Sequence, residues 1–127
     1  MDGRTTTDLA YRMLGIETIA NRSGFDIAYL VHIYGDVDTI AAKTLRTALS
    51  HASELGMGRV IALLDNCKYF DSSGLAVLIA MRKTLGARLK VVVPHDNPLR
   101  HIFDITGLVS GLQIVASIDE AFEQPVS

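Results

Sequence analysis

Two hydroxyls and a carboxylate stand together in the run Asp71-Ser72-Ser73-Gly74. Apolar stretches lie on both sides of this run, which places it where a buried strand gives way to a helix. At the start of a helix, free backbone N–H groups and the positive end of the helix dipole favour an anion. A phosphoryl group on one of the two serines could therefore be accommodated there without unfolding the chain.

The same four residues also fit a purely structural role, because Asp and Ser are the commonest residues at the start of a helix. If Asp71 caps the helix, both serine hydroxyls stay free for modification. If Ser72 is the cap, a kinase must first break its hydrogen bond. The sequence leaves these two arrangements open.

Turn and cap residues at regular intervals predict the strands and helices that position this loop. Two strand-like stretches flank the turn signal Asn21-Arg22-Ser23-Gly24 and indicate an antiparallel hairpin. From Gly35 onward, helix and strand alternate with their own start and stop residues. We expect helices from Asp36 or Asp38 to Gly56, from Asp71 to near Gly86, from Asn97 to Gly107 and from Ser117 onward, and strands over 60–64, 89–93 and 112–115.

This alternation predicts an α/β fold, with a mostly parallel sheet, an N-terminal antiparallel hairpin and about four helices. The run from Val60 to Leu64 is apolar without a break, as is typical of a central strand that is covered on both faces. The helix after Asp71 is apolar almost all round through Met81, so we expect it to be mostly buried and its first turn to be fixed. Residues 1–9 are polar and Thr-rich, which predicts a flexible arm before a single domain over 10–127.

Composition excludes several classes of function. The formal net charge is −2 and the basic residues are scattered, so nucleic-acid binding is not expected. No apolar run approaches the ~20 residues of a membrane span, and the start has no signal-peptide pattern, so we expect a cytoplasmic protein without membrane insertion. Cys67 is the single cysteine; we expect a buried or half-buried thiol and no disulfide or metal site.

The motifs of common enzymes are missing from the sequence. It contains no G-x-S-x-G nucleophile elbow, no phosphate-binding G-x-x-x-x-G-K-[ST] loop, and no paired histidines at a metal-binding spacing. His95 and His101 border the Asn97 helix, where solvated surface histidines are the expected outcome. We therefore expect no catalytic residues, no cofactor and no enzymatic activity.

Four segments, taken together and in order, resemble the STAS domain family, and specifically the bacterial anti-sigma-factor antagonists. They are Gly35-Asp36-Val37-Asp38, Leu64-Asp65, Phe70-Asp71-Ser72-Ser73-Gly74-Leu75, and the stretch from Leu99 through Gly107-Leu108. The resemblance covers roughly Met13 to Phe122. The chain departs from the family pattern in the polar run Asn66-Cys67-Lys68 and in a longer N-terminal arm.

The resemblance implies a partner-switching cycle. An antagonist of this kind binds an anti-sigma factor that is also a serine kinase, and so frees a sigma factor for transcription. The kinase phosphorylates the first serine of the loop, here Ser72, with Ser73 as the alternative acceptor, and a PP2C-type phosphatase reverses the modification. The residues expected to contact the partner are Asp36, Asp38, Asp71, Ser72, Ser73 and Gly74.

A second function belongs to the same fold. Related domains act as scaffold subunits of stress-signalling complexes or as accessory subunits of membrane transporters, with no sigma factor involved. In that case Ser72 would only take part in starting the helix.

Overall fold

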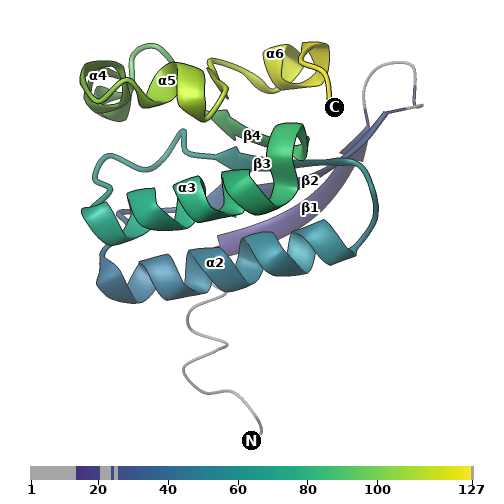
Figure 1. Cartoon of the computed structure of the whole chain (residues 1–127), viewed down its shortest axis with the longest axis horizontal. Coiled ribbons are helices and arrows are strands. Elements are labelled where there is room, and N and C mark those ends of the chain that lie inside the picture. Colours follow the sequence, from purple (N-terminus) through teal and green to yellow (C-terminus); the bar gives the residue numbers. More distant parts are fainter. Residues whose placement is uncertain (1–13, 21–23, 25, 127) are drawn as a thin grey trace, which may run out of the picture.

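The computed structural model describes residues 14–20, 24 and 26–126, which form a five-stranded sheet with the strand order β1-β2-β3-β4-β5 (Figure 1). The strands are β1 (Leu14–Ala20), β2 (Ile27–Ile33), β3 (Arg59–Leu63), β4 (Leu89–Val92) and β5 (Ile114–Val115). β1 is antiparallel to β2, and every later neighbouring pair is parallel. The predicted mixed sheet with an N-terminal hairpin is confirmed. The flexible arm expected over residues 1–9, and most of the predicted hairpin turn, lie outside the described residues.

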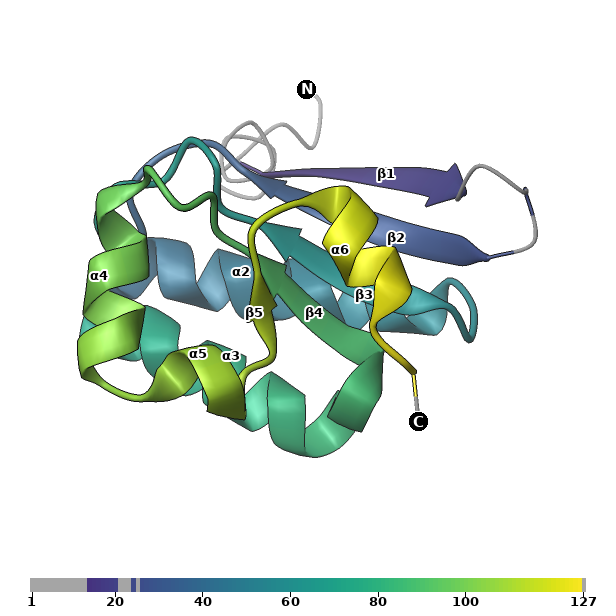
Figure 2. The ribbon, with the colours of Figure 1, turned by 90° about the horizontal axis from the view of Figure 1, so that it is seen from above.

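The α-helices of the described residues are α2 (Thr39–Glu54), α3 (Ser72–Leu85), α4 (Pro98–Ile105), α5 (Leu108–Gly111) and α6 (Ile118–Glu123). α2 and α3 lie side by side on one face of the sheet, and α6 covers part of the other face (Figures 1 and 2). Because β2 and β3 are parallel neighbours, the loops that follow them emerge at the same edge of the sheet. α2 and α3 therefore begin next to each other.

Apolar side chains cover both faces of the sheet, which explains the unbroken apolar runs of the inner strands. The larger cluster fills the space between the sheet and the helices α2, α3 and α4, and includes Val31, Leu45, Leu78 and Phe103. A smaller cluster on the opposite face packs against α6. The start of α3 thus rests on the main core of the protein.

Three expectations about the second half of the chain were wrong in detail. α3 is buried on one face only, since Ile79 is 38% exposed. The chain also enters the additional short helix α5 straight after Gly107, whose φ of +74° lies in the left-handed region that glycine tolerates. The last strand starts at Ile114 instead of 112, because Leu112 still bonds back to Leu108 and Gln113 has a φ of +52° that a strand does not accommodate.

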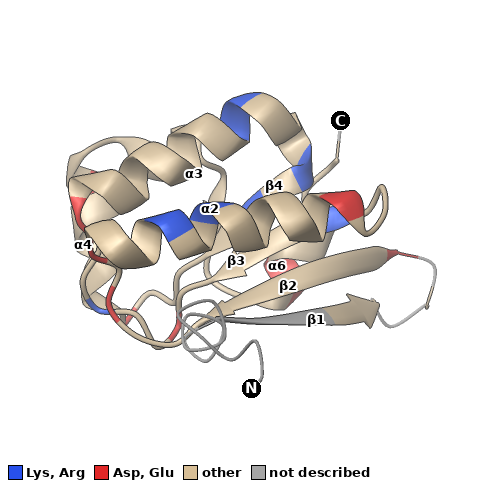
Figure 3. Cartoon of the chain, turned by 90° about the horizontal axis from the view of Figure 1, so that it is seen from below, with Lys and Arg blue, Asp and Glu red and all other residues tan. Residues whose placement is uncertain are grey.

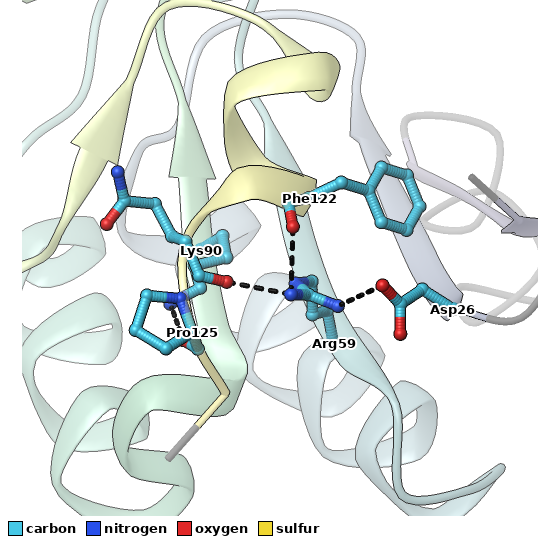
Figure 4. Close-up of polar contacts among 6 residues, drawn as sticks. Asp26, Arg59, Lys90, Phe122 and Pro125 are labelled. Atoms are coloured by element: carbon cyan, nitrogen blue, oxygen red, sulfur yellow. Dashed lines mark hydrogen bonds and ion pairs between the residues drawn. The ribbon is translucent and has the colours of Figure 1, made fainter. Parts of the chain in front are cut away.

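Two cations inside the sheet anchor the C-terminal segment, which the sequence patterns did not suggest (Figure 4). Arg59 Nη2 donates to the carbonyl oxygens of Phe122 at 2.9 Å and Gln124 at 2.8 Å. Lys90 is fully buried, and its Nζ donates to Pro125 O at 2.6 Å and to Gln113 Oε1 at 2.7 Å. These bonds satisfy carbonyls at and beyond the end of α6 that have no partner within the helix.

Candidate functional site

Asp71, not Ser72, caps α3. Its backbone is extended, with φ −83° and ψ 179°, and its Oδ1 accepts hydrogen bonds from Ser73 N at 2.8 Å and Gly74 N at 3.2 Å. These are two of the amides that a helix start leaves without an intrahelical partner. The structure thus decides between the two arrangements that the sequence left open.

The two serines differ in their surroundings. Ser72 is the first residue of α3, its side chain is exposed, and its hydroxyl makes no hydrogen bond to another described residue. Ser73 is half-buried, and its Oγ lies 3.4 Å from Thr39 Oγ1. Thr39 in turn donates to Asp71 Oδ2 at 3.3 Å. Ser72 therefore carries the free hydroxyl of the pair.

The loop before α2 and the loop before α3 are bonded to each other through their backbones. Val37 N donates to Tyr69 O at 2.9 Å, and Asp71 N donates to Val37 O at 3.0 Å, which forms a parallel bridge between Val37 and Phe70. Asp36 Oδ1 adds to this link by accepting from the amides of Lys68 at 3.3 Å and Tyr69 at 3.1 Å. Asp36 thus holds the shape of the loop that precedes Ser72.

Asp38 has a different role from Asp36. It caps α2, with Oδ1 accepting from Ala41 N at 2.8 Å, and its side chain is exposed. Acidic positions lie along the loops at the end of the sheet where α2 and α3 begin, whereas the basic positions of these helices lie further along (Figure 3). The structure brings Asp36, Asp38 and Asp71 to one edge of the sheet.

Gly74 is required by close packing. A Cβ at this position would lie 2.5 Å from the ring of Phe70 and 2.9 Å from Val37 Cγ1, closer than real Cβ contacts come. Phe70 and Val37 are both buried, so the first turn of α3 sits directly on the bridged loops. Ser72 is consequently presented from a rigid support.

A third loop also holds the site, through a residue that the sequence identified only as a helix cap. Asn97 Oδ1 accepts from Leu99 N at 2.9 Å, as expected of the cap of α4. Its Nδ2 donates to Leu64 O and Cys67 O, each at 2.9 Å, and the side chain is 7% exposed. Asn97 therefore ties the loop after β3 to the loop after β4. The Asn-Pro cap pattern gives no signal for these contacts, which exist only in the folded chain.

Cys67 is a structural thiol within the same loop. It is fully buried, and its Sγ donates to Tyr69 O at 3.2 Å. Burial raises the pKa of this thiol from 9.0 to about 11, so it stays protonated at neutral pH. The predicted buried thiol is confirmed, and its neighbours Asn66 and Lys68 are exposed.

Two large apolar side chains next to the site face solvent. Ile40, in the first turn of α2, is 74% exposed, and Tyr69, two residues before Asp71, is 53% exposed.

Within the described part of the chain, no group of three His, Cys, Asp or Glu residues is placed to hold a metal ion, and no helix is long and apolar enough to cross a membrane. His95 and His101 are exposed, as expected.

The STAS domain profile matches residues 19–121, and the chain belongs to this family. Among its relatives is an anti-sigma-B factor antagonist of Bacillus subtilis (strain 168), which is 37% identical over 68% of this chain and 80% of the relative. The family and fold expected from the sequence are confirmed.

Solved structures share the fold. One is an anti-sigma factor antagonist from Mycobacterium paratuberculosis, with a TM-score of 0.68 at 19% identity over 87% of this chain and 92% of that one. Another is the Bacillus cell fate determinant SpoIIAA in its phosphorylated form, with a TM-score of 0.56 at 21% identity over 87% of this chain and 96% of that one.

Proposed function

We propose that this protein is an anti-sigma-factor antagonist whose binding to an anti-sigma factor with serine kinase activity is switched off by phosphorylation of Ser72. The observation that carries the proposal is the exposed, unbonded hydroxyl of Ser72 at the first position of α3. A kinase can reach this oxygen without breaking any hydrogen bond of the described fold. When the protein is unmodified, the anti-sigma factor is occupied and a sigma factor is released. This cycle takes place in the cytoplasm and needs no catalytic activity of the chain itself.

The surroundings of Ser72 are suited to a protein interface. Ile40 and Tyr69 offer exposed apolar surface, and Asp36, Asp38 and Asp71, in the two bridged loops, give the same edge of the sheet an acidic character. Apolar contacts can supply affinity there, while the acidic groups favour a partner surface that carries basic residues. Ser73 is half-buried beside Ser72 in the first turn of α3, whereas Gly74 is buried and supports this surface from beneath instead of contacting a partner itself.

The phosphoryl group acts on this interface through its charge. A phosphoserine carries about −1.5 to −2 charges at neutral pH, and beside Asp71 it adds like-charge repulsion and a desolvation cost to any docked complex. A loss of only about 1.4 kcal/mol weakens binding tenfold. Because the cap of α3 comes from Asp71, the fold itself does not depend on the Ser72 hydroxyl. Modification is therefore expected to change the surface and leave the domain folded.

Reversal of the switch requires a phosphatase, for which a PP2C-type enzyme is the expected partner. Support for a phosphorylated state comes from SpoIIAA, a protein of the same fold whose structure is of its phosphorylated form. An exposed Ser72 is as accessible to a phosphatase as it is to a kinase.

The test is incubation of the purified protein with its cognate kinase and ATP, followed by intact mass measurement and fragment mapping. The wild type is expected to gain one phosphoryl group at Ser72. On the same timescale Ser72→Ala should stay unmodified, whereas Ser73→Ala should be modified like the wild type. Modification that persists in Ser72→Ala and disappears in Ser73→Ala would reverse the assignment. Failure of every serine kinase from the same source to act would favour a scaffold or accessory subunit instead.

A further inference from the structure

We infer that Thr39 is a specificity-determining residue, which directs phosphorylation to Ser72 by engaging the hydroxyl of Ser73. This inference rests on the proposed function and concerns the choice between two neighbouring acceptors. The residues lie on different helices: Thr39 is the first residue of α2, and the two serines open α3.

The hydrogen-bond directions follow from the number of protons available. The Thr39 hydroxyl has a single hydrogen, and it donates this to the carboxylate Oδ2 of Asp71. For the contact between Thr39 Oγ1 and Ser73 Oγ to be a hydrogen bond, Ser73 must then be the donor. The result is a chain in which Ser73 donates to Thr39 and Thr39 donates to Asp71. The hydroxyl proton of Ser73 is therefore held in a hydrogen bond, whereas that of Ser72 is not donated to any described residue.

Phosphoryl transfer needs an accessible serine oxygen whose hydroxyl proton is not held in another hydrogen bond, and Ser73 does not meet this requirement. A serine Oγ attacks the γ-phosphorus of ATP, a new Oγ–P bond forms, the bond from that phosphorus to the bridging oxygen breaks, and ADP leaves. The hydroxyl proton passes to a base of the kinase. At Ser72 the oxygen is exposed and its proton is free to leave. At Ser73 the oxygen is half-buried, and a phosphoryl group would displace the Thr39 hydroxyl and sit beside the Asp71 carboxylate.

The position of Thr39 is fixed by contacts that do not involve its own side chain. Asp38 caps α2 immediately before it, and the backbone bonds of Val37 to Tyr69 and Asp71 lock the two helix starts together. Its β-branched side chain has few rotamers, which limits where the hydroxyl can point. The two oxygen distances, 3.3 and 3.4 Å, exceed the usual 2.7–2.8 Å of O–H···O bonds, so the expected effect is modest.

The inference is tested where Ser73 is the only hydroxyl left, in the Ser72→Ala background. The initial rate of Ser73 phosphorylation is measured by fragment mass spectrometry over long incubations with the cognate kinase and ATP. Adding Thr39→Val, which keeps the shape and removes the hydroxyl, should raise this rate about fivefold, the factor that corresponds to one weak hydrogen bond. Adding Thr39→Ser, which restores a hydroxyl, should return the rate to the low value.

Thr47→Val is the matched control, because Thr47 is an exposed threonine on the same helix whose hydroxyl bonds only within it, to Lys43 O. It should leave the Ser73 rate unchanged. The inference would be overturned if Ser73 were phosphorylated at the same rate in Ser72→Ala with and without Thr39→Val, or if neither protein were modified. Modification of Ser72 in the wild type would be unaffected by that result. An unmodified wild type would instead overturn the proposed function, so the two failures are distinguishable.

Discussion

Because Lys90 is buried, the free energy of unfolding of the protein should change with pH in the alkaline range. Burial, with the nearby charges of Arg82 and Arg59, lowers the pKa of Lys90 from 10.5 to about 8. Below pH 8 the side chain is charged in both the folded and the unfolded chain. Between pH 8 and 10.5 the folded protein loses this proton and the unfolded chain keeps it, so the free energy of unfolding should rise with pH. The 2.5-unit difference between the two pKa values corresponds to about 3 kcal/mol.

The variant Lys90→Met isolates this contribution, since it keeps a long apolar stem and removes the charge. Urea unfolding is measured for both proteins from pH 7 to 10.5, and the quantity of interest is the difference between their free energies of unfolding. This difference should move in favour of the wild type by about 3 kcal/mol across the window. Cys67 works in the opposite direction, because its raised pKa means that the unfolded chain ionises first above pH 9. Its effect is common to both proteins and cancels. A difference that stays flat from pH 7 to 10.5 would refute the reasoning.

Three further changes test the site. Ser72→Glu should weaken binding to the kinase partner at least tenfold in calorimetry while the thermal midpoint stays the same; unchanged affinity would remove the electrostatic account. Gly74→Ala should lower the free energy of unfolding by about 1–2 kcal/mol, because the clash with the Phe70 ring outweighs the better helix propensity of Ala. Asn97→Ala removes side-chain hydrogen bonds to four backbone groups and should cost about 3 kcal/mol in urea unfolding; a loss below 1 kcal/mol would argue against the tie between loops.

The parts of the fold that could be predicted are those encoded locally. Unbroken apolar runs marked the inner strands, and the caps Asn97 and Ser117 marked helix starts, because a cap bonds to amides two or three residues away. For the first helix the sequence offered Asp36 or Asp38, and the structure shows that Asp38 is the cap. The exposure of Ile79 could not be anticipated in this way. Its apolar side chain fits the pattern of a buried helix, but only one face of α3 meets the sheet and α2.

In the candidate site, too, the locally encoded features could be predicted and the contacts between distant residues could not. The loop from Asp71 to Gly74 could be identified from the sequence, and so could its position between a strand and a helix. Which residue caps α3 could not, because Asp and Ser both suit that position. The contacts of Thr39 with α3 and of Asn97 with the loop after β3 join residues about thirty positions apart. These contacts exist because neighbouring strands of the sheet are parallel, which brings their following loops together, and no local sequence pattern predicts them.

The loop before Ser72 is held mainly by its backbone, and this gives its exposed side chains freedom to diverge. Asp36 binds two of its amides and Asn97 binds three of its carbonyls, while the exposed side chains of Asn66 and Lys68 support none of these bonds. Duplicated copies of such a gene could therefore exchange residues 66 and 68 without reshaping the loop.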